Sequence, residues 1–280
     1  MADLAVRHRG LSGLGYVKRP APGAMFDEHS VSWRFAARWP ILAGGGAAVL
    51  YQVAHPAVGA GVAQHSTYET DPFGRLERTL YAMLAISFGS PERRDEVLVG
   101  LRNMHRPVTG QQEDGQGYRA LDPSLQLWVW ATLVRVALDV DRRYLRQLSA
   151  EERNAYYLEQ RQLARAFRVP EEVIPADLTA FDEYFADMVE HHLVVAEDAK
   201  SVAASILRPK VRFVPRSAMI PVELVTIDLL PRSLRSAYGL RTLNPVEKRF
   251  LRSSRWLTRT VLPKLPEQLL ANPFNRRAIA

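Results

Sequence analysis

Three side chains in the first half of the chain have types and spacing that could do chemistry: Arg75, Thr79 and His105. On a helix, Arg75 and Thr79 share one face, with Arg78 at its edge. His105 ends an apolar helical stripe made of Val97, Leu98, Leu101 and Met104. One imidazole on an apolar wall, with an arginine nearby, could ligate haem iron while the cation pairs a propionate or polarises bound dioxygen. A lone histidine on such a face is more often a hydrogen-bonded core residue, so the spacing leaves both interpretations open.

Two consecutive helices must position these side chains, one from Asp71 to Gly89 and one from Ser90 to Gly110. Asp71-Pro72 and Ser90-Pro91 each combine an N-cap residue with a proline in the first turn, and Gly89 is a typical helix end. These start and stop signals predict two adjacent helices whose functional faces are held in register.

A series of short motifs follows between about residues 30 and 145. They are Gln52-Val53-Ala54-His55-Pro56-Ala57-Val58, Asp71-Pro72-Phe73-Gly74-Arg75 with Thr79, Phe88-Gly89, His105-Arg106-Pro107-Val108-Thr109-Gly110, and Tyr118-Arg119-Ala120-Leu121-Asp122-Pro123 with Trp128. In this order and spacing they resemble the catalytic domain shared by latex-clearing rubber oxygenases and MpaB-type oxygenases.

The resemblance implies an all-helical protein that binds haem b through one axial histidine, which His105 matches. The arginine and threonine of that family match Arg75 and Thr79. It also makes His55 a residue of the pocket wall, and Trp128 could flank the cofactor, although a tryptophan on such a stripe is more often in the core. Members with known activity cleave isoprenoid double bonds with dioxygen, so we expect oxidation of an apolar isoprenoid or lipid-like substrate.

The sequence departs from the latex-clearing pattern at two positions. Those enzymes have a lysine just before the matching threonine, whereas this chain has Arg78, which cannot lose its proton and so cannot replace lysine as an iron ligand. The position of their upstream glutamate falls here between Gly59 and Gly61, and the nearest carboxylate is Glu69. These differences argue against rubber as the substrate. They leave Glu69, with the histidines at positions 55 and 65, as candidates for a general base.

Composition predicts a single domain. The chain has 280 residues and 47% hydrophobic content, enough for a large core, and no low-complexity linker divides it. We expect a haem-binding helical core over about residues 25–200 and a basic helical layer over residues 201–280. The sequence contains no cysteine, which excludes disulfides and thiolate ligands, so any iron must be bound by nitrogen or oxygen.

The net charge of +7 is unevenly distributed. Residues 201–280 contain 15 lysines and arginines against four acidic residues, a balance of +11. Such asymmetry can indicate anionic lipid, nucleic acid or an acidic partner, although most basic surface is only solvated. A second hypothesis is therefore a non-catalytic helical binding module that docks on acidic partners or a membrane, with no nucleic acid expected. A haem sensor or carrier without turnover is a third.

Residues 41–63 carry no formal charge and are long enough to span a membrane. The glycines at 44–46, 59 and 61, together with Pro56, favour two short buried helices, and no phosphate-loop lysine follows the three glycines. The segment Met1–Gly23 has no apolar run of a secretory signal, so we expect a cytoplasmic protein, with peripheral membrane contact left open.

Three further patterns carry weaker expectations. Residues 111–117 read as a polar loop that could gate the pocket. Asp122 to Leu148 reads as one long helix with Asp139 and Asp141 near its exposed end. His191 and His192, flanked by acidic residues, could bind a non-haem metal, but a place on the pocket wall or on the surface is the more common role of such histidines.

Overall fold

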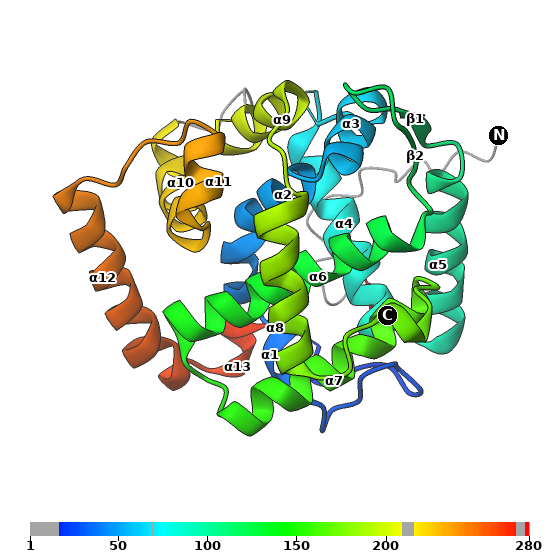
Figure 1. Cartoon of the computed structure of the whole chain (residues 1–280). Coiled ribbons are helices and arrows are strands. Elements are labelled where there is room, and N and C mark those ends of the chain that lie inside the picture. Colours follow the sequence, from blue (N-terminus) through cyan, green and yellow to red (C-terminus); the bar gives the residue numbers. More distant parts are fainter. Residues whose placement is uncertain (1–16, 69, 209–215, 273–277, 280) are drawn as a thin grey trace.

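Helices make up nearly all of the regular structure (Figure 1). The computed structural model describes residues 17–68, 70–208, 216–272 and 278–279. Within these ranges the α-helices are α1 (Val31–Ala36), α2 (Gly45–Val53), α3 (Pro56–His65), α4 (Pro72–Phe88), α5 (Pro91–His105), α6 (Pro123–Val140), α7 (Ala150–Ala166), α8 (Leu178–Asp187), α9 (Glu197–Leu207), α10 (Arg216–Leu229), α11 (Arg232–Ala237), α12 (Pro245–Val261) and α13 (Glu267–Leu270). The predicted all-α class is confirmed.

Short helical turns and one hairpin complete the described structure. The 3-10 and π-helical turns cover Trp39–Gly44, Asp141–Leu145, Glu171–Val173, Met188–His192 and Leu262–Lys264. Strands β1 (Thr109–Gln111) and β2 (Gly117–Arg119) pair in antiparallel fashion. The loop predicted over residues 111–117 is therefore mostly the turn of a β-hairpin. Strands of three residues are too short to leave an alternating pattern that sequence reading could detect.

The predicted caps of α4 and α5 are present. Asp71 accepts a hydrogen bond from the Gly74 amide at 3.0 Å, and Ser90 accepts one from the Arg93 amide at 3.3 Å. Each helix also begins with a proline, whose missing N–H is not needed in a first turn. Because Gly89 and Ser90 alone separate α4 from α5, the two helices fold back on each other and pack side by side.

The core is built around α6, which passes through the middle of the molecule (Figure 1). Its tryptophans 128 and 130 are among the largest fully enclosed side chains. The same hydrophobic cluster includes Leu224 of α10, Leu234 of α11 and Leu251 of α12, so the C-terminal helices share this core. That residues 1–280 form one domain stays a prediction.

The three consecutive glycines allow close helix packing. A Cβ at Gly44 would lie 2.2 Å from the Cγ1 atom of Val136, and one at Gly46 would lie 2.2 Å from the Oγ1 atom of Thr226. A Cβ at Gly45 would meet nothing within 4 Å. Two of the three positions thus hold α2 against α6 and α10, as the sequence suggests.

The long helix predicted from Asp122 to about Leu148 is present to Leu145, because α6 continues directly into the π-helical turn Asp141–Leu145, but its end is not exposed as expected. Helix α6 stops at Val140, and Asp139 and Asp141, expected near solvent, are buried. Asp141 accepts hydrogen bonds from the backbone amides of residues 147 and 148 and pairs with Arg153 at 3.2 Å. Asp139 pairs with Arg135 at 2.9 Å. Burial of these carboxylates is tolerated because each has charged or amide partners.

Among the described residues, no single helix has both the length and the apolar content to cross a membrane. The segments Trp39–Ala54 and Pro56–His65 reach that level only when taken together, and they meet at a bend of 105°.

The three glycines at positions 44–46 allow a direct test of this packing through protein stability. We expect Gly44→Ala and Gly46→Ala each to lower the free energy of unfolding by about 1–3 kcal/mol, because the new methyl group overpacks the core. Gly45→Ala should instead raise it by about 0.4–1 kcal/mol, because its backbone is already helical and the unfolded chain loses freedom. Urea unfolding of the three variants measures both signs, and equal effects at the three positions would contradict this packing.

Candidate functional site

The turn at Gly89-Ser90 brings Arg75 and His105 to the same end of a helix pair. Arg75 precedes Gly89 by 14 residues and His105 follows Ser90 by 15, so at equal rise per residue both lie at about the same height. Helices α4 and α5 run next to each other in Figure 1. The expected juxtaposition of the two helices is present.

The His105 imidazole is fixed by one backbone hydrogen bond. Its Nδ1 atom lies 2.8 Å from the carbonyl oxygen of Leu101, one turn earlier in α5. A carbonyl oxygen only accepts, so Nδ1 must donate its proton and the neutral ring keeps its lone pair on Nε2. Metal-binding histidines commonly use one ring nitrogen in this way and ligate with the other.

Arg75 and Arg78 have different surroundings. Arg78 is exposed and pairs with the N-cap residue Asp71 at 3.0 Å, so it supports the start of α4. Arg75 is half-buried and has no acidic partner among the residues that the structure describes. Burial, followed by the positive charge of Arg78, lowers the pKa of the Arg75 guanidinium, which nevertheless stays protonated. Arg75 is therefore a cation available to an anionic group.

Thr79 is exposed, and its Oγ1 atom donates to the Arg75 carbonyl oxygen at 2.9 Å. Its hydroxyl proton is thus used within α4, which leaves the oxygen as an acceptor. Met104, expected on the apolar stripe before His105, is exposed instead. It lies one residue away from the His105 position, off the inward face of α5.

Helix α5 has an apolar face that the protein covers only in part. Val97, Leu98 and Leu101 are half-buried and pack against the main core with Met83 of α4, and α5 has no fully buried residue. Haem needs flat apolar contacts, an axial nitrogen and cations for its propionates. The apolar face, His105 Nε2 and Arg75 supply these three features, so the residues present fit haem b.

The β-hairpin fixes the C-terminal end of α5. The backbone amide of Val108 donates to the His105 carbonyl oxygen at 3.0 Å, and the Tyr118 hydroxyl donates to Gln64 of α3 at 2.7 Å. His65 places its Nε2 atom 3.1 Å from the Thr109 carbonyl oxygen. The hairpin and the residue before it thus join the end of α5 to α3.

His55 lies at the bend between α2 and α3. Its Nδ1 atom is buried without a hydrogen-bond partner in the described structure. Burial, followed by the nearby charge of His192, lowers the pKa of the His55 imidazole, so the ring is neutral at ordinary pH. That His55 lines the wall of the haem pocket remains a prediction. Glu69, the candidate base, lies outside the described residues.

Trp128 is fully enclosed in the core. Its ring lies 5.2 Å from that of Phe185, and its Nε1 atom donates to the Gln52 carbonyl oxygen at 3.4 Å. This is the core placement that is common for a tryptophan on such a stripe.

The pair His191 and His192 does not form a metal centre with its acidic neighbours. Both imidazoles are exposed, and each lies about 3 Å from one oxygen of Asp187. No group of three or more histidine, cysteine or acidic residues that could hold a metal ion occurs in the described ranges.

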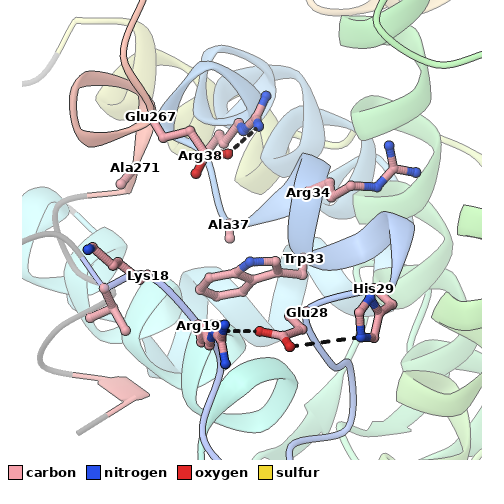
Figure 2. Close-up of a pocket in the computed structure, with 11 residues that line it drawn as sticks. Lys18, Arg19, Glu28, His29, Trp33, Arg34, Ala37, Arg38, Glu267 and Ala271 are labelled. Carbon is pink, nitrogen blue, oxygen red and sulfur yellow. Dashed lines mark hydrogen bonds and ion pairs between the residues drawn. The ribbon is translucent and has the colours of Figure 1, made fainter.

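A hollow of about 370 Å³ lies between the N-terminal segment, α1 and α13 (Figure 2). Arg19 pairs there with Glu28 at 2.8 Å, and Arg38 pairs with Glu267 at 3.0 Å. Its lining is mostly charged and comes from elements other than α4 and α5. It offers neither an apolar wall nor His105, so it does not compete as a haem pocket.

Comparisons with known proteins agree with the motif resemblance. The family model described as "ER-bound oxygenase mpaB/B'/Rubber oxygenase, catalytic domain" matches residues 33–261. The chain is 30% identical over 168 residues to the uncharacterized proteins Mb2261 of Mycobacterium bovis and Rv2237 of Mycobacterium tuberculosis. That match covers 58% of this chain and 66% of each relative. No solved structure gives a significant match.

The histidine geometry predicts opposite tautomers for His105 and His65. At about pH 8.5, where ordinary histidines are neutral, His105 should carry its proton on Nδ1 and His65 on Nε2, because those atoms face carbonyl oxygens. Two-bond proton–nitrogen correlation spectra of histidine-labelled protein distinguish the forms, with His105→Gln and His65→Gln variants for assignment. An Nε2–H tautomer at His105 would remove the free nitrogen from the site.

Proposed function

The chain belongs to the family of mpaB and rubber-oxygenase catalytic domains, and on that premise we propose that it is a haem b-dependent oxygenase of apolar, isoprenoid or lipid-like substrates. Family membership makes the protein an oxidoreductase that uses dioxygen on a small molecule. The cofactor, the substrate class and cleavage of a carbon–carbon double bond are the proposed part.

The observation that carries the proposal is the state of His105. Its Nδ1 atom is held by the Leu101 carbonyl oxygen, and its Nε2 lone pair is free for an axial bond. The residue also continues the partly covered face of α5 formed by Val97, Leu98 and Leu101. A candidate ligand nitrogen and an apolar wall thus occur on one helix.

Bound haem would supply the redox-active iron that dioxygen chemistry requires. Arg75 would pair with a propionate, since it is half-buried and has no carboxylate of its own among the described residues. Thr79 would add an acceptor oxygen next to it, because its proton is already donated to the Arg75 carbonyl. Arg78 would act indirectly, by keeping the start of α4 in place through Asp71.

The apolar wall and the family support the proposed substrate class, although the wall by itself selects no particular compound. Gly59 and Gly61 stand where latex-clearing enzymes place a glutamate, and a Cβ at Gly61 would lie 3.3 Å from the Tyr118 ring. A carboxylate at that position would meet the hairpin. Rubber cleavage by that route is therefore not proposed, and Glu69 remains the candidate base.

Removal of the ligand tests the cofactor. Protein produced with ample haem should show a Soret band, and His105→Ala should lose or shift it because the axial nitrogen is gone. We expect haem affinity to fall by more than the roughly 10- to 100-fold that loss of an outer-shell partner costs. Absorption spectra and pyridine haemochrome content measure this.

His65→Ala is the matched control, because His65 is exposed on α3, where its Nε2 atom lies 3.1 Å from the Thr109 carbonyl oxygen, and its loss should leave the Soret band unchanged. Circular dichroism confirms that both variants fold. A wild-type protein that stays colourless after haem titration would overturn the haem assignment.

A pair of hydrocarbons tests the reaction. Double-bond cleavage inserts both atoms of dioxygen, so one alkene and one dioxygen give two carbonyl groups without an added reductant. Haem-loaded protein should therefore consume dioxygen with squalene and not with squalane, which has the same skeleton without double bonds. Electrode traces and carbonyl derivatisation measure uptake and products. Equal uptake with both compounds, or none with a panel of unsaturated isoprenoids, would contradict this substrate class.

A further inference from the structure

Helix α12 lies at one edge of the molecule, opposite α5 (Figure 1). It begins with a reciprocal cap in which Asn244 and Glu247 bond each other's backbone amides. Its inner side is attached by Leu251 in the core, by Arg255 paired with Asp228, and by the Thr258 hydroxyl, which donates to the Tyr144 carbonyl oxygen at 2.6 Å. The helix is therefore ordered and fixed in orientation without any partner on its outer side.

The outer side of α12 exposes an apolar strip. Spacing of four, seven and four residues places its members on one helical face. They are Val246, Phe250, Leu257 and Val261, with exposed fractions of 76%, 44%, 52% and 37%. Single exposed apolar residues are ordinary, but here four exposed apolar side chains share one face of a single helix.

A basic edge runs beside this strip. Lys248, Arg249 and Arg252 have no acidic partner among the residues that the structure describes. Arg249 and Arg252 line a hollow of about 350 Å³ together with Ser253 and Trp256, whose indole is 67% exposed. Two guanidinium groups suit phosphate oxygens, and a tryptophan beside them suits a water–lipid boundary.

We propose that α12 is an in-plane docking surface for membranes that contain anionic phospholipids. The apolar strip enters the boundary between headgroups and acyl chains, while Arg249 and Arg252 bind headgroup phosphates in the hollow. Apolar area and positive charge on one helix are the two terms that determine binding of such helices to lipid. The excess of +11 over residues 201–280 attracts the protein to the same surface.

Charge favours lipid over the other possible occupants. A two-fold contact between copies of this chain would place the basic edges of both α12 helices near each other, and like charges oppose such a contact. Nucleic acid would meet the guanidinium groups but would leave Val246, Leu257 and Val261 against a charged backbone. An anionic bilayer matches both halves of the surface.

Vesicle flotation of the full-length protein tests the proposal. In 0.1 M salt the protein should float with phosphatidylcholine vesicles that contain 30% phosphatidylglycerol and stay behind with pure phosphatidylcholine. Phe250→Ser/Leu257→Ser should lower the partition coefficient at least about tenfold through lost apolar contact. Arg249→Gln/Arg252→Gln should lower it about 30-fold through lost attraction to the anionic surface.

Two matched variants control for area and charge. Leu158→Ser/Val173→Ser removes two similarly exposed apolar side chains from other elements, and Arg168→Gln/Lys200→Gln removes two positive charges away from α12. Both should float like the wild type. Circular dichroism and melting curves confirm folding of every variant.

The proposal is overturned if the wild type binds no anionic vesicles, or if the control variants lose as much binding as the α12 variants. It is also overturned if binding depends on the arginines while the Phe250/Leu257 variant floats normally, which indicates a purely ionic contact. Sedimentation velocity that shows a dimer dispersed by Leu257→Ser would assign the strip to a second copy. None of these results depends on haem. Failure of the membrane proposal can therefore be distinguished from failure of the haem proposal, which the spectra of the His105 variants test.

Discussion

The two-residue turn between α4 and α5 is the constraint on which the candidate site depends. Gly89 donates its amide to the Ala85 carbonyl oxygen at 3.0 Å, and a Cβ there would lie 2.5 Å from that oxygen. Phe88, just before the turn, is buried between Phe26 and Trp33, with ring centroids 6.2 and 5.1 Å away. Because the turn is short and anchored, neither helix can slide, and the heights of Arg75 and His105 follow from it.

Within this frame, the two arginines of α4 differ in whether they have an acidic partner. Arg78 forms an ion pair with Asp71, whereas the half-buried Arg75 has no carboxylate partner in the described structure. A protein optimised only for stability would pair or remove such a group, because an unpaired buried charge is costly. Features that break local rules are expected at functional sites. The same reasoning applies to the apolar face of α5, which its own fold covers only in part.

Local signals made much of this structure predictable. Caps, prolines and glycines mark α4 and α5, and the glycine run correctly indicated close packing. The predictions that failed concern contacts between residues far apart in the sequence. The burial of Asp141 depends on Arg153 in the next helix, and the hairpin depends on its packing against α3. Likewise, no sequence rule distinguishes Arg75 from Arg78 before the partner of each is known, so motifs could nominate candidate site residues but could not give their electrostatics.

The two exposed features of this protein lie at opposite edges, and this separation has a physical consequence. Docking through α12 would hold the α4–α5 end on the far side from the lipid surface (Figure 1). Substitutions at sites that share no contacts have nearly additive effects on free energy. Changes in α12 should therefore alter lipid affinity without altering cofactor affinity, and changes in α4 and α5 should do the reverse. An apolar substrate would then reach His105 along the protein surface rather than directly from the bilayer beneath α12. If both proposals hold, the membrane would concentrate enzyme and apolar substrate together, while the α4–α5 face would select what reacts.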